Sequence, residues 1–184
     1  MDLEQLIVSR RTVQSFKSDK VDDEVVRKAL ELSLWAPNHK LTFPWVYTWV
    51  GPHARAELAE LAAELKSAKK PLSETEKKAV RTTVLNPSHL IMLGLRKSQD
   101  AHRSHEDYAT LACSVQIASE ILWQRKIGSK WTSAGWSTHA RTYEILKVSP
   151  EEVVLEGGLM VGVPLIVPAA NARPALHKFL RMVD

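Results

Sequence analysis

The sequence predicts an α+β fold in three layers (α/β/α), with helices on both faces of a central sheet. Helical and strand patterns alternate along the chain in the order α, α, β, α, α, β, α, β, α, β. Few strands follow one another directly, so hairpins cannot build the sheet and helices are expected on both of its faces. The length of 184 residues fits one domain, residues 1–184, with a substantial core.

The first part of the chain predicts two helices and a strand. Apolar side chains at helical spacing predict a short helix over residues 3–9. The carboxylates of Asp22 and Asp23 suit the positive end of a second helix, which is expected to end before Pro37. The aromatic and β-branched run over residues 45–50 predicts the first strand.

The middle of the chain predicts a third helix, a second strand and a long central helix. Apolar residues over 58–65 mark the third helix, whereas residues 66–83 lack a clear stripe and are expected to form a mobile, solvated helix or lid. Residues 88–95 predict a buried strand. The apolar stripe from Tyr108 to Leu122 predicts the long helix.

The last part predicts two further strands, over residues 129–133 and 155–163, with a helix over 138–147 between them. The sequence Ser149-Pro150-Glu151-Glu152 resembles a capping box with proline at the first helical position, so it predicts a helix start. The tail over 172–182 is expected to form a short helix and to pack on a partner subunit.

Composition narrows the functional classes. A net charge of +4 and a pI of about 9.2, spread along the chain, suit an anionic small ligand better than nucleic acid. The single cysteine, Cys113, is expected in the core and does not imply an oxidising compartment. No signal-peptide pattern and no run of about 18 apolar residues occurs, which favours a cytoplasmic protein with no membrane partner.

Several familiar sites are not indicated. No Gly-x-Gly-x-x-Gly follows a strand, and the P-loop pattern is absent. His102 and His105 have i, i+3 spacing, but Arg103 and Glu106 beside them favour a solvated helix face over a metal site.

Arg10-Arg11-Thr12 forms the first candidate site. Guanidinium groups bind phosphate through a planar fork, and a threonine hydroxyl can add a hydrogen bond. Taken alone, the pair fits a solvated basic helix end better than a phosphate site. The second candidate is the polar loop Ala36-Pro37-Asn38-His39-Lys40, followed by Pro44-Trp45, which taken alone fits a surface connector better than a binding site.

Four motifs in order resemble those of the nitroreductase family. Residues 10–12 resemble its opening Arg-Arg-Ser/Thr, and residues 36–45 resemble its Ala-Pro-(Ser/Asp)-(His/Asn)…Gln-Pro-Trp. Residues 128–133 are similar to the Gly-Gly-x-Trp-x-Ser strand of its shortest members, and residues 155–164 to a closing strand that ends Leu-Gly-x-Pro. The resemblance spans almost the whole chain.

This resemblance implies a mainly antiparallel sheet and an FMN-dependent homodimer with flavins at the subunit interface. Arg10 and Thr12 would bind the phosphate, and Arg11 would line the same strip of cofactor. Six further residues would surround the flavin, some of them reaching across from the other subunit: Trp35, Pro37, His39, Trp131, Thr132 and Ser133.

Two positions depart from the family pattern. The shortest relatives carry a basic residue where this chain has Thr132, and Lys130, on the same strand face, is the candidate to replace that cation. Thr42-Phe43 stands where the family often has glutamine.

The function implied is an FMN-dependent oxidoreductase. Electrons would pass from NADH or NADPH through FMN to a nitroaromatic, a quinone or a similar electrophilic acceptor by a ping-pong mechanism, with no catalytic side chain and no metal. The departures at Thr132 and Thr42-Phe43 leave open a flavin-binding protein with a specialised or lost reductase activity. A basic nucleic-acid-binding module has only the pI and the paired arginines in its favour.

Overall fold

A four-stranded antiparallel sheet forms the centre of the fold. The computed structural model describes residues 2–183. The strands β1 (Trp45–Trp49), β2 (His89–Arg96), β3 (Gly128–Thr132) and β4 (Val153–Gly162) lie in the order β1-β2-β4-β3. All three strand pairs are antiparallel, which confirms the mainly antiparallel sheet.

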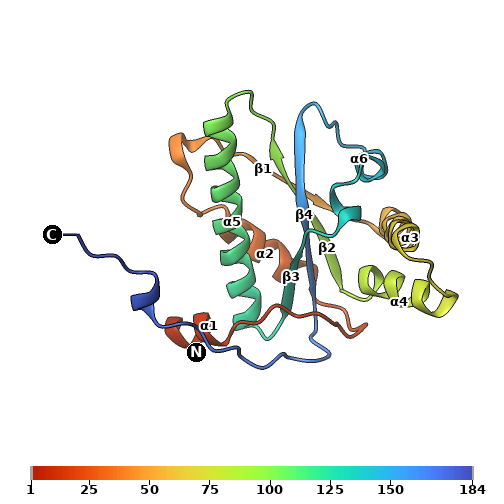
Figure 1. Ribbon diagram of the computed structural model, residues 1–184, viewed down its shortest axis with the longest axis horizontal. Coiled ribbons are helices and arrows are strands. Elements are labelled where there is room, and N and C mark those ends of the chain that lie inside the picture. The colour runs from red at the N-terminus through yellow and green to blue at the C-terminus, as the bar shows by residue number, and fades with distance from the viewer. Residues whose placement is uncertain (1, 184) are drawn as a thin grey trace.

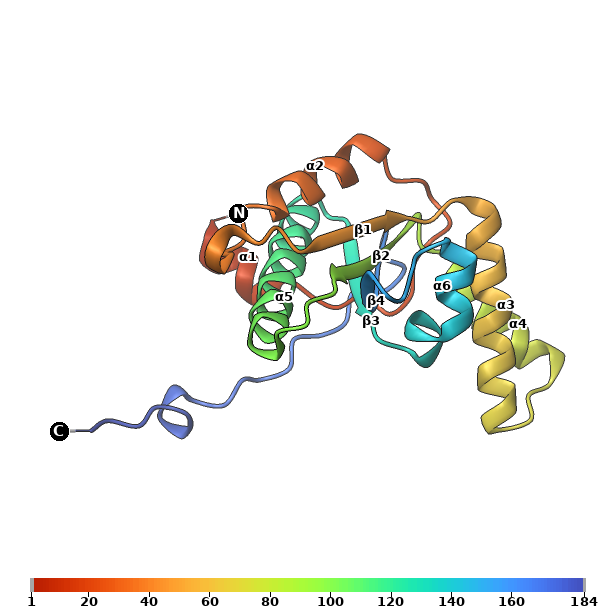
Figure 2. The ribbon, with the colours of Figure 1, turned by 90° about the horizontal axis from the view of Figure 1, so that it is seen from above.

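Helices cover both faces of this sheet (Figures 1 and 2). On one face lie α2 (Asp23–Ser33) and the long α5 (Ala101–Gln124). On the other lie α3 (Pro52–Lys69), α4 (Glu74–Leu85) and α6 (Ala140–Leu146). The three-layer α+β architecture predicted from the sequence is therefore confirmed.

Strand β2 shows why the core has two halves. Alternate side chains of a strand point to opposite faces of the sheet. Leu90 and Met92 accordingly belong to the hydrophobic cluster on the α3 and α4 side, whereas Ile91 and Leu93 belong to the cluster on the α2 and α5 side. A strand with both faces covered appears in the sequence as a continuous apolar run, as residues 88–95 do.

Residues 66–83 contain the end of one helix and most of the next. Helix α3 continues to Lys69, and a separate helix, α4, begins at Glu74. Ser73 and Glu76 form a reciprocal capping box at its start, with Ser73 N–H donating to the Glu76 carboxylate at 2.8 Å. The solvated helix predicted here is therefore present, as parts of two helices, and its mobility stays a prediction.

Four predictions are wrong. Ser149 starts a turn rather than a helix, since its hydroxyl accepts from Glu151 N–H at 3.3 Å and β4 begins at Val153. Cys113 is exposed, and Tyr108, the first residue of the predicted stripe, is 44% exposed. The tail over 172–182 forms only the 3-10 turn η3 (Leu176–Lys178).

The two ends of the chain meet at one edge of the fold. Helix α1 (Leu3–Ser9) lies near the carboxyl end of α5, and the C-terminal segment passes it before extending away from the body (Figures 1 and 2). Within residues 2–183, no helix combines the length and apolar character needed to cross a membrane.

Candidate functional site

The paired arginines lie beside the start of β3. Thr12 forms a parallel β-bridge with Ser129, and Val13 N–H donates to the Ser129 carbonyl at 3.1 Å. A Cβ atom on Gly128 would lie 2.5 Å from Val13 Cγ2, so this close approach needs glycine. The fold thus brings residues 10–12 against the strand that carries Lys130, as the resemblance implied.

A cavity of about 620 Å³ opens at the arginines. Arg10, Arg11 and Thr12 line it from one side, and Asn171 and Arg173 line it from the C-terminal segment. The C-terminal segment reaches this wall after two backbone hydrogen bonds, at 2.9 and 3.0 Å, between residues 15–17 and 163–165. Sequence reasoning missed Arg173, because no local spacing links it to Arg10.

The two arginines are in different electrostatic positions. Arg11 Nη1 donates to the carbonyls of Val8 and Arg10, both at 2.8 Å, so it satisfies free carbonyls where α1 ends. Arg10 Nε is buried without a hydrogen-bond partner. A buried donor without a partner costs about 1–3 kcal/mol, so Arg10 is held in place at a cost in stability that Arg11 does not bear.

Strand β3 places its side chains on alternate faces. Lys130 pairs in register with Met160 and Thr132 with Gly158, so these two side chains share a face, as the sequence predicted. Thr132 is 6% exposed, whereas Lys130 is only partly buried. Lys130 is therefore the cation that this face of the strand offers.

Trp131 lies on the opposite face and is held by the protein itself. Its Nε1–H donates to the Glu156 carbonyl at 3.0 Å, and its ring centroid lies 6.2 Å from that of Tyr108. Ser133 follows the end of the strand and is exposed. Of the three residues expected to close the flavin site, Ser133 is thus the most exposed to solvent.

A β-bulge in β4 supports this arrangement. Leu93 pairs with Gly157 and Gly94 with Leu155, so Glu156 is the extra residue. Gly157 has φ +122°, and a Cβ atom there would lie 2.3 Å from the Thr132 carbonyl oxygen, which demands glycine. Partial burial raises the pKa of the Glu156 carboxyl above its ordinary value.

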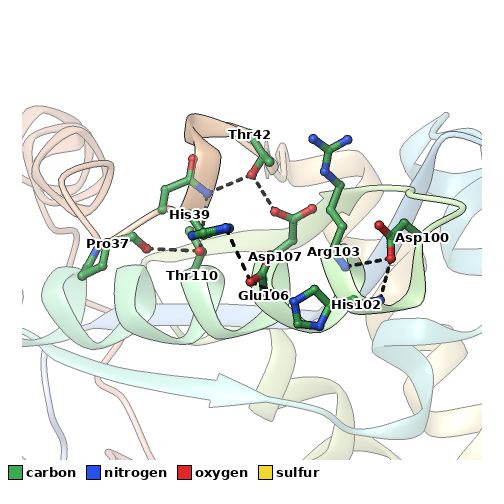
Figure 3. A network of polar contacts seen from close by, with 10 residues as sticks. Pro37, His39, Thr42, Asp100, His102, Arg103, Glu106, Asp107 and Thr110 are labelled. Atoms are coloured by element: carbon green, nitrogen blue, oxygen red, sulfur yellow. Dashed lines mark hydrogen bonds and ion pairs between the residues drawn. The ribbon is translucent and has the colours of Figure 1, made fainter.

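Asn38 organises the second candidate region, the loop between α2 and β1, whose residues Pro37, His39 and Thr42 lie beside α5 in Figure 3. Its Oδ1 accepts from Phe43 N–H at 2.8 Å, and its Nδ2 donates to Thr42 Oγ1 at 2.8 Å. Thr42 Oγ1 donates in turn to Asp107 Oδ1 of α5 at 2.6 Å. The loop is therefore fixed to the amino-terminal half of α5.

This fixed loop has an unusual backbone and an apolar surface. Lys40, Leu41 and Phe43 have φ values of +56°, +50° and +46°, in the left-handed region that costs free energy for residues other than glycine. Trp35 is 84% exposed and Phe43 57% exposed. Strained backbone of this kind clusters at functional sites, so the loop is a candidate part of a binding site.

The structure does not bring this loop to the arginines within one chain. Trp123 Nε1–H donates to Ser9 Oγ at 3.1 Å beside α1, whereas Thr110 Oγ1 donates to the Pro37 carbonyl at 3.1 Å. The 13 residues from Thr110 to Trp123 span about 20 Å of helix at 1.5 Å per residue. The loop that carries Trp35, Pro37 and His39 thus lies about 20 Å along α5 from the end of α1, which Arg10 follows.

The histidines near this loop form surface ion pairs. His102 Nε2 lies 3.3 Å and His39 Nε2 3.9 Å from Glu106 Oε1 (Figure 3). His105 is exposed. Among residues 2–183, no three His, Cys, Asp or Glu side chains converge as a metal ion would require.

Comparison with known proteins identifies the class. The sequence profile described as "Nitroreductase family" matches residues 7–163. YfhC of Bacillus subtilis (strain 168), which bears the name of an NAD(P)H nitroreductase, is 26% identical over 133 residues, 71% of this chain and 69% of that protein. The chain belongs to the nitroreductase family.

Solved structures agree on the fold. A nitroreductase-like family protein from Bacillus cereus superposes with a TM-score of 0.86 at 22% identity, covering 100% of this chain and 97% of that chain. The FMN-dependent nitroreductase NfnB from Mycobacterium smegmatis, solved in complex with NADPH, gives a TM-score of 0.75 at 20% identity, covering 98% of this chain and 97% of that chain.

Proposed function

We propose that this protein is an FMN-dependent oxidoreductase that takes electrons from NADH or NADPH and delivers them to a nitroaromatic, quinone or similar electrophilic acceptor. The observation that carries the proposal is the cavity of about 620 Å³ that is lined by Arg10, Arg11 and Arg173. Guanidinium groups bind a phosphate ester through charge-assisted hydrogen bonds. Family membership and the FMN named for the relative NfnB support the same ligand.

Each residue at the cavity has its own role in binding FMN. Arg10 donates to the phosphate, and Thr12 offers a hydroxyl beside it. Arg173, on the opposite wall of the cavity, adds a second cation and so compensates for Thr132 together with Lys130. Arg11 contributes its charge while one of its nitrogens stays with the end of α1.

The chemistry needs little from the protein beyond position and charge. FMN supplies the two-electron transfer, so no side chain need act as nucleophile or general base. Ser133 and the backbone that follows β3 lie at the end of the strand away from the arginines, where they are placed to contact the ring. A double-reciprocal plot at several acceptor concentrations should give parallel lines, as a ping-pong mechanism requires. Intersecting lines would contradict it.

We further propose a homodimer with two flavin sites at the interface. The exposed loop with Trp35, Pro37 and His39 cannot reach the Arg10 cavity of its own chain, so a second copy supplies it. Large apolar side chains are exposed on α1 and on the C-terminal segment, as expected of a surface that another subunit covers. They are Leu3, Ile7, Val8, Leu165, Ile166, Val167, Leu176, Phe179, Leu180 and Met182.

Subunit mixing tests this shared site. Arg10→Ala removes one half of the site and Asn38→Ala loosens the loop that forms the other half. In a mixed dimer both defects fall in one site and the other site is intact, so re-associated mixtures should regain about a quarter of the wild-type activity. If each site belonged to a single chain, mixing would restore nothing.

The alternative is a flavin-binding protein with a specialised or lost reductase activity. The observation that favours it is the neutral, buried Thr132 where short relatives carry a cation. Binding of FMN without reduction by NADH or NADPH would select this alternative. We also propose that the protein works in the cytoplasm. This is a reducing compartment, and a chain with a single cysteine fits it.

A further inference from the structure

Two adjoining hollows run between α3 and α4. The inner hollow, about 300 Å³, has a largely apolar floor that includes Ala62, Leu65 and Val80, and it ends at Trp136 of the 3-10 turn η2 (Gly135–Thr138). The outer hollow, about 400 Å³, continues from it, because both are lined by Lys66, Val80 and Thr83. We call the two together the lysine groove.

The lysine groove begins where β3 ends. Ser129 near the start of β3 contacts Thr12, and the groove wall includes Ala134 and Gly135, just beyond the end of the strand. The five residues from Ser129 to Ala134 span at most about 16 Å at 3.3 Å per residue. Strand β3 therefore connects the phosphate end of the proposed flavin site with the mouth of the groove.

The charge of the groove is not cancelled by its surroundings. Lys66 and Lys69 line the inner hollow, and Lys66 and Lys70 the outer one. Nearby carboxylates are engaged elsewhere, in the pairs Glu60–Arg81, Glu64–Arg141 and Glu74–Lys77. None of the ion pairs within residues 2–183 uses these three lysines.

One acidic residue lies within the groove. Glu76 lines the outer hollow, but its Oε2 accepts from the N–H and the hydroxyl of Ser73, both at 2.8 Å. These hydrogen bonds, and to a smaller extent the charge of Lys66, lower the pKa of the Glu76 carboxyl, and the hydrogen bonds hold it at the start of α4. The groove thus presents three ammonium groups against one engaged carboxylate, beside an apolar floor.

We propose that the lysine groove binds the phosphate groups of the nicotinamide dinucleotide and thereby makes NADPH the preferred reductant. This inference rests on the proposed function. NADPH carries an additional phosphate monoester, worth about −1.5 to −2 charges at pH 7, so an unpaired lysine cluster favours it over NADH. The apolar floor next to Trp136 suits the flat rings of the same molecule.

Kinetics of a double variant test the assignment. Lys66→Gln/Lys69→Gln should raise the KM for NADPH roughly tenfold and change the KM for NADH less. An exposed ion pair between a lysine and a phosphate changes the affinity by at most about fivefold, and two lysines are removed. Lys78→Gln, an exposed lysine of α4 outside the groove, is the matched control and should leave both constants unchanged. An unchanged preference between the two reductants in the double variant would overturn the proposal.

A binding measurement separates this proposal from the proposed function. Adenosine 2′,5′-bisphosphate should bind the wild-type protein more tightly than AMP, and the double variant should lose that difference while retaining its FMN. Equal binding of the two probes to the wild type would overturn the groove assignment with the flavin proposal intact. A protein that binds no FMN, yet loses bisphosphate binding on removal of Lys66 and Lys69, would refute the proposed function and leave the anion site standing.

Discussion

Replacing Arg10 with methionine should weaken FMN binding while leaving the protein without FMN at least as stable as the wild type. The variant keeps an apolar stem of similar length but removes the guanidinium. A hydrogen bond to a charged group contributes about 1.5–3 kcal/mol, so the Kd for FMN should rise by about ten- to a hundredfold or more. Without FMN, the variant also loses the buried Nε that has no partner, which costs the wild type about 1–3 kcal/mol.

Two assays on the same protein read out these opposite effects. FMN titration followed by flavin fluorescence gives the Kd, and urea unfolding of the FMN-free protein gives the free energy of unfolding. Arg103→Met, at an exposed arginine of α5 whose guanidinium points away from the polar network in Figure 3, is the control and should change neither quantity. An Arg10→Met protein with unchanged FMN affinity, or one strongly destabilised without FMN, would refute the reasoning.

Three further substitutions test the parts that support the site. Thr42→Val removes the hydroxyl that donates to buried Asp107, so the free energy of unfolding should fall by about 1–3 kcal/mol in a urea titration, whereas Thr42→Ser should restore it. Gly157→Ala forces a side chain at φ +122° and 2.3 Å from a carbonyl oxygen, so Tm should fall by several degrees, whereas Gly51→Ala, with open space around it, should leave Tm nearly unchanged. Burial raises the pKa of Glu156 above its ordinary 4.5, so the stability that its protonated form contributes is lost as pH rises through the folded-state value. Glu156→Gln should therefore raise Tm at pH 7 and lose that gain near pH 4, and a lower Tm at pH 7 would contradict this.

Local periodicity was sufficient to predict the elements that depend on it. Residues 88–95 and the stripe from Leu111 to Leu122 became β2 and the buried face of α5. The same helical geometry explains the error at Cys113. It follows Leu111 by two residues, which turns it by about 200° away from that buried stripe at 3.6 residues per turn. The spacing of the buried stripe is therefore enough to predict that Cys113 lies on the exposed side of α5.

Capping signals explain two other differences between the prediction and the structure. Ser73 and Glu76 form the capping box that starts α4, a separate start that the prediction of one segment over residues 66–83 did not include. Ser149 carries a similar pattern, yet only a turn separates it from β4, so no helix has room to form. A cap predicts a helix only where enough residues follow it before the next strand.

Some residues of the candidate site could be predicted from local sequence motifs, whereas others depend on contacts between distant parts of the chain. Arg10 and the strand around Lys130 could be predicted from motifs, and the Thr12–Ser129 bridge places them side by side. Arg173 could not, because only the path of the C-terminal segment brings it to the same cavity. The distance along α5 between the arginines and the loop at Pro37 also depends on tertiary contacts that no local pattern contains.

The absorption spectrum of the purified protein tests the central claim most directly. We predict a yellow protein with a flavin band, which fades when NADH or NADPH is added without oxygen and returns when a quinone or nitroaromatic acceptor follows. A colourless protein that fails to bind added FMN would contradict the account.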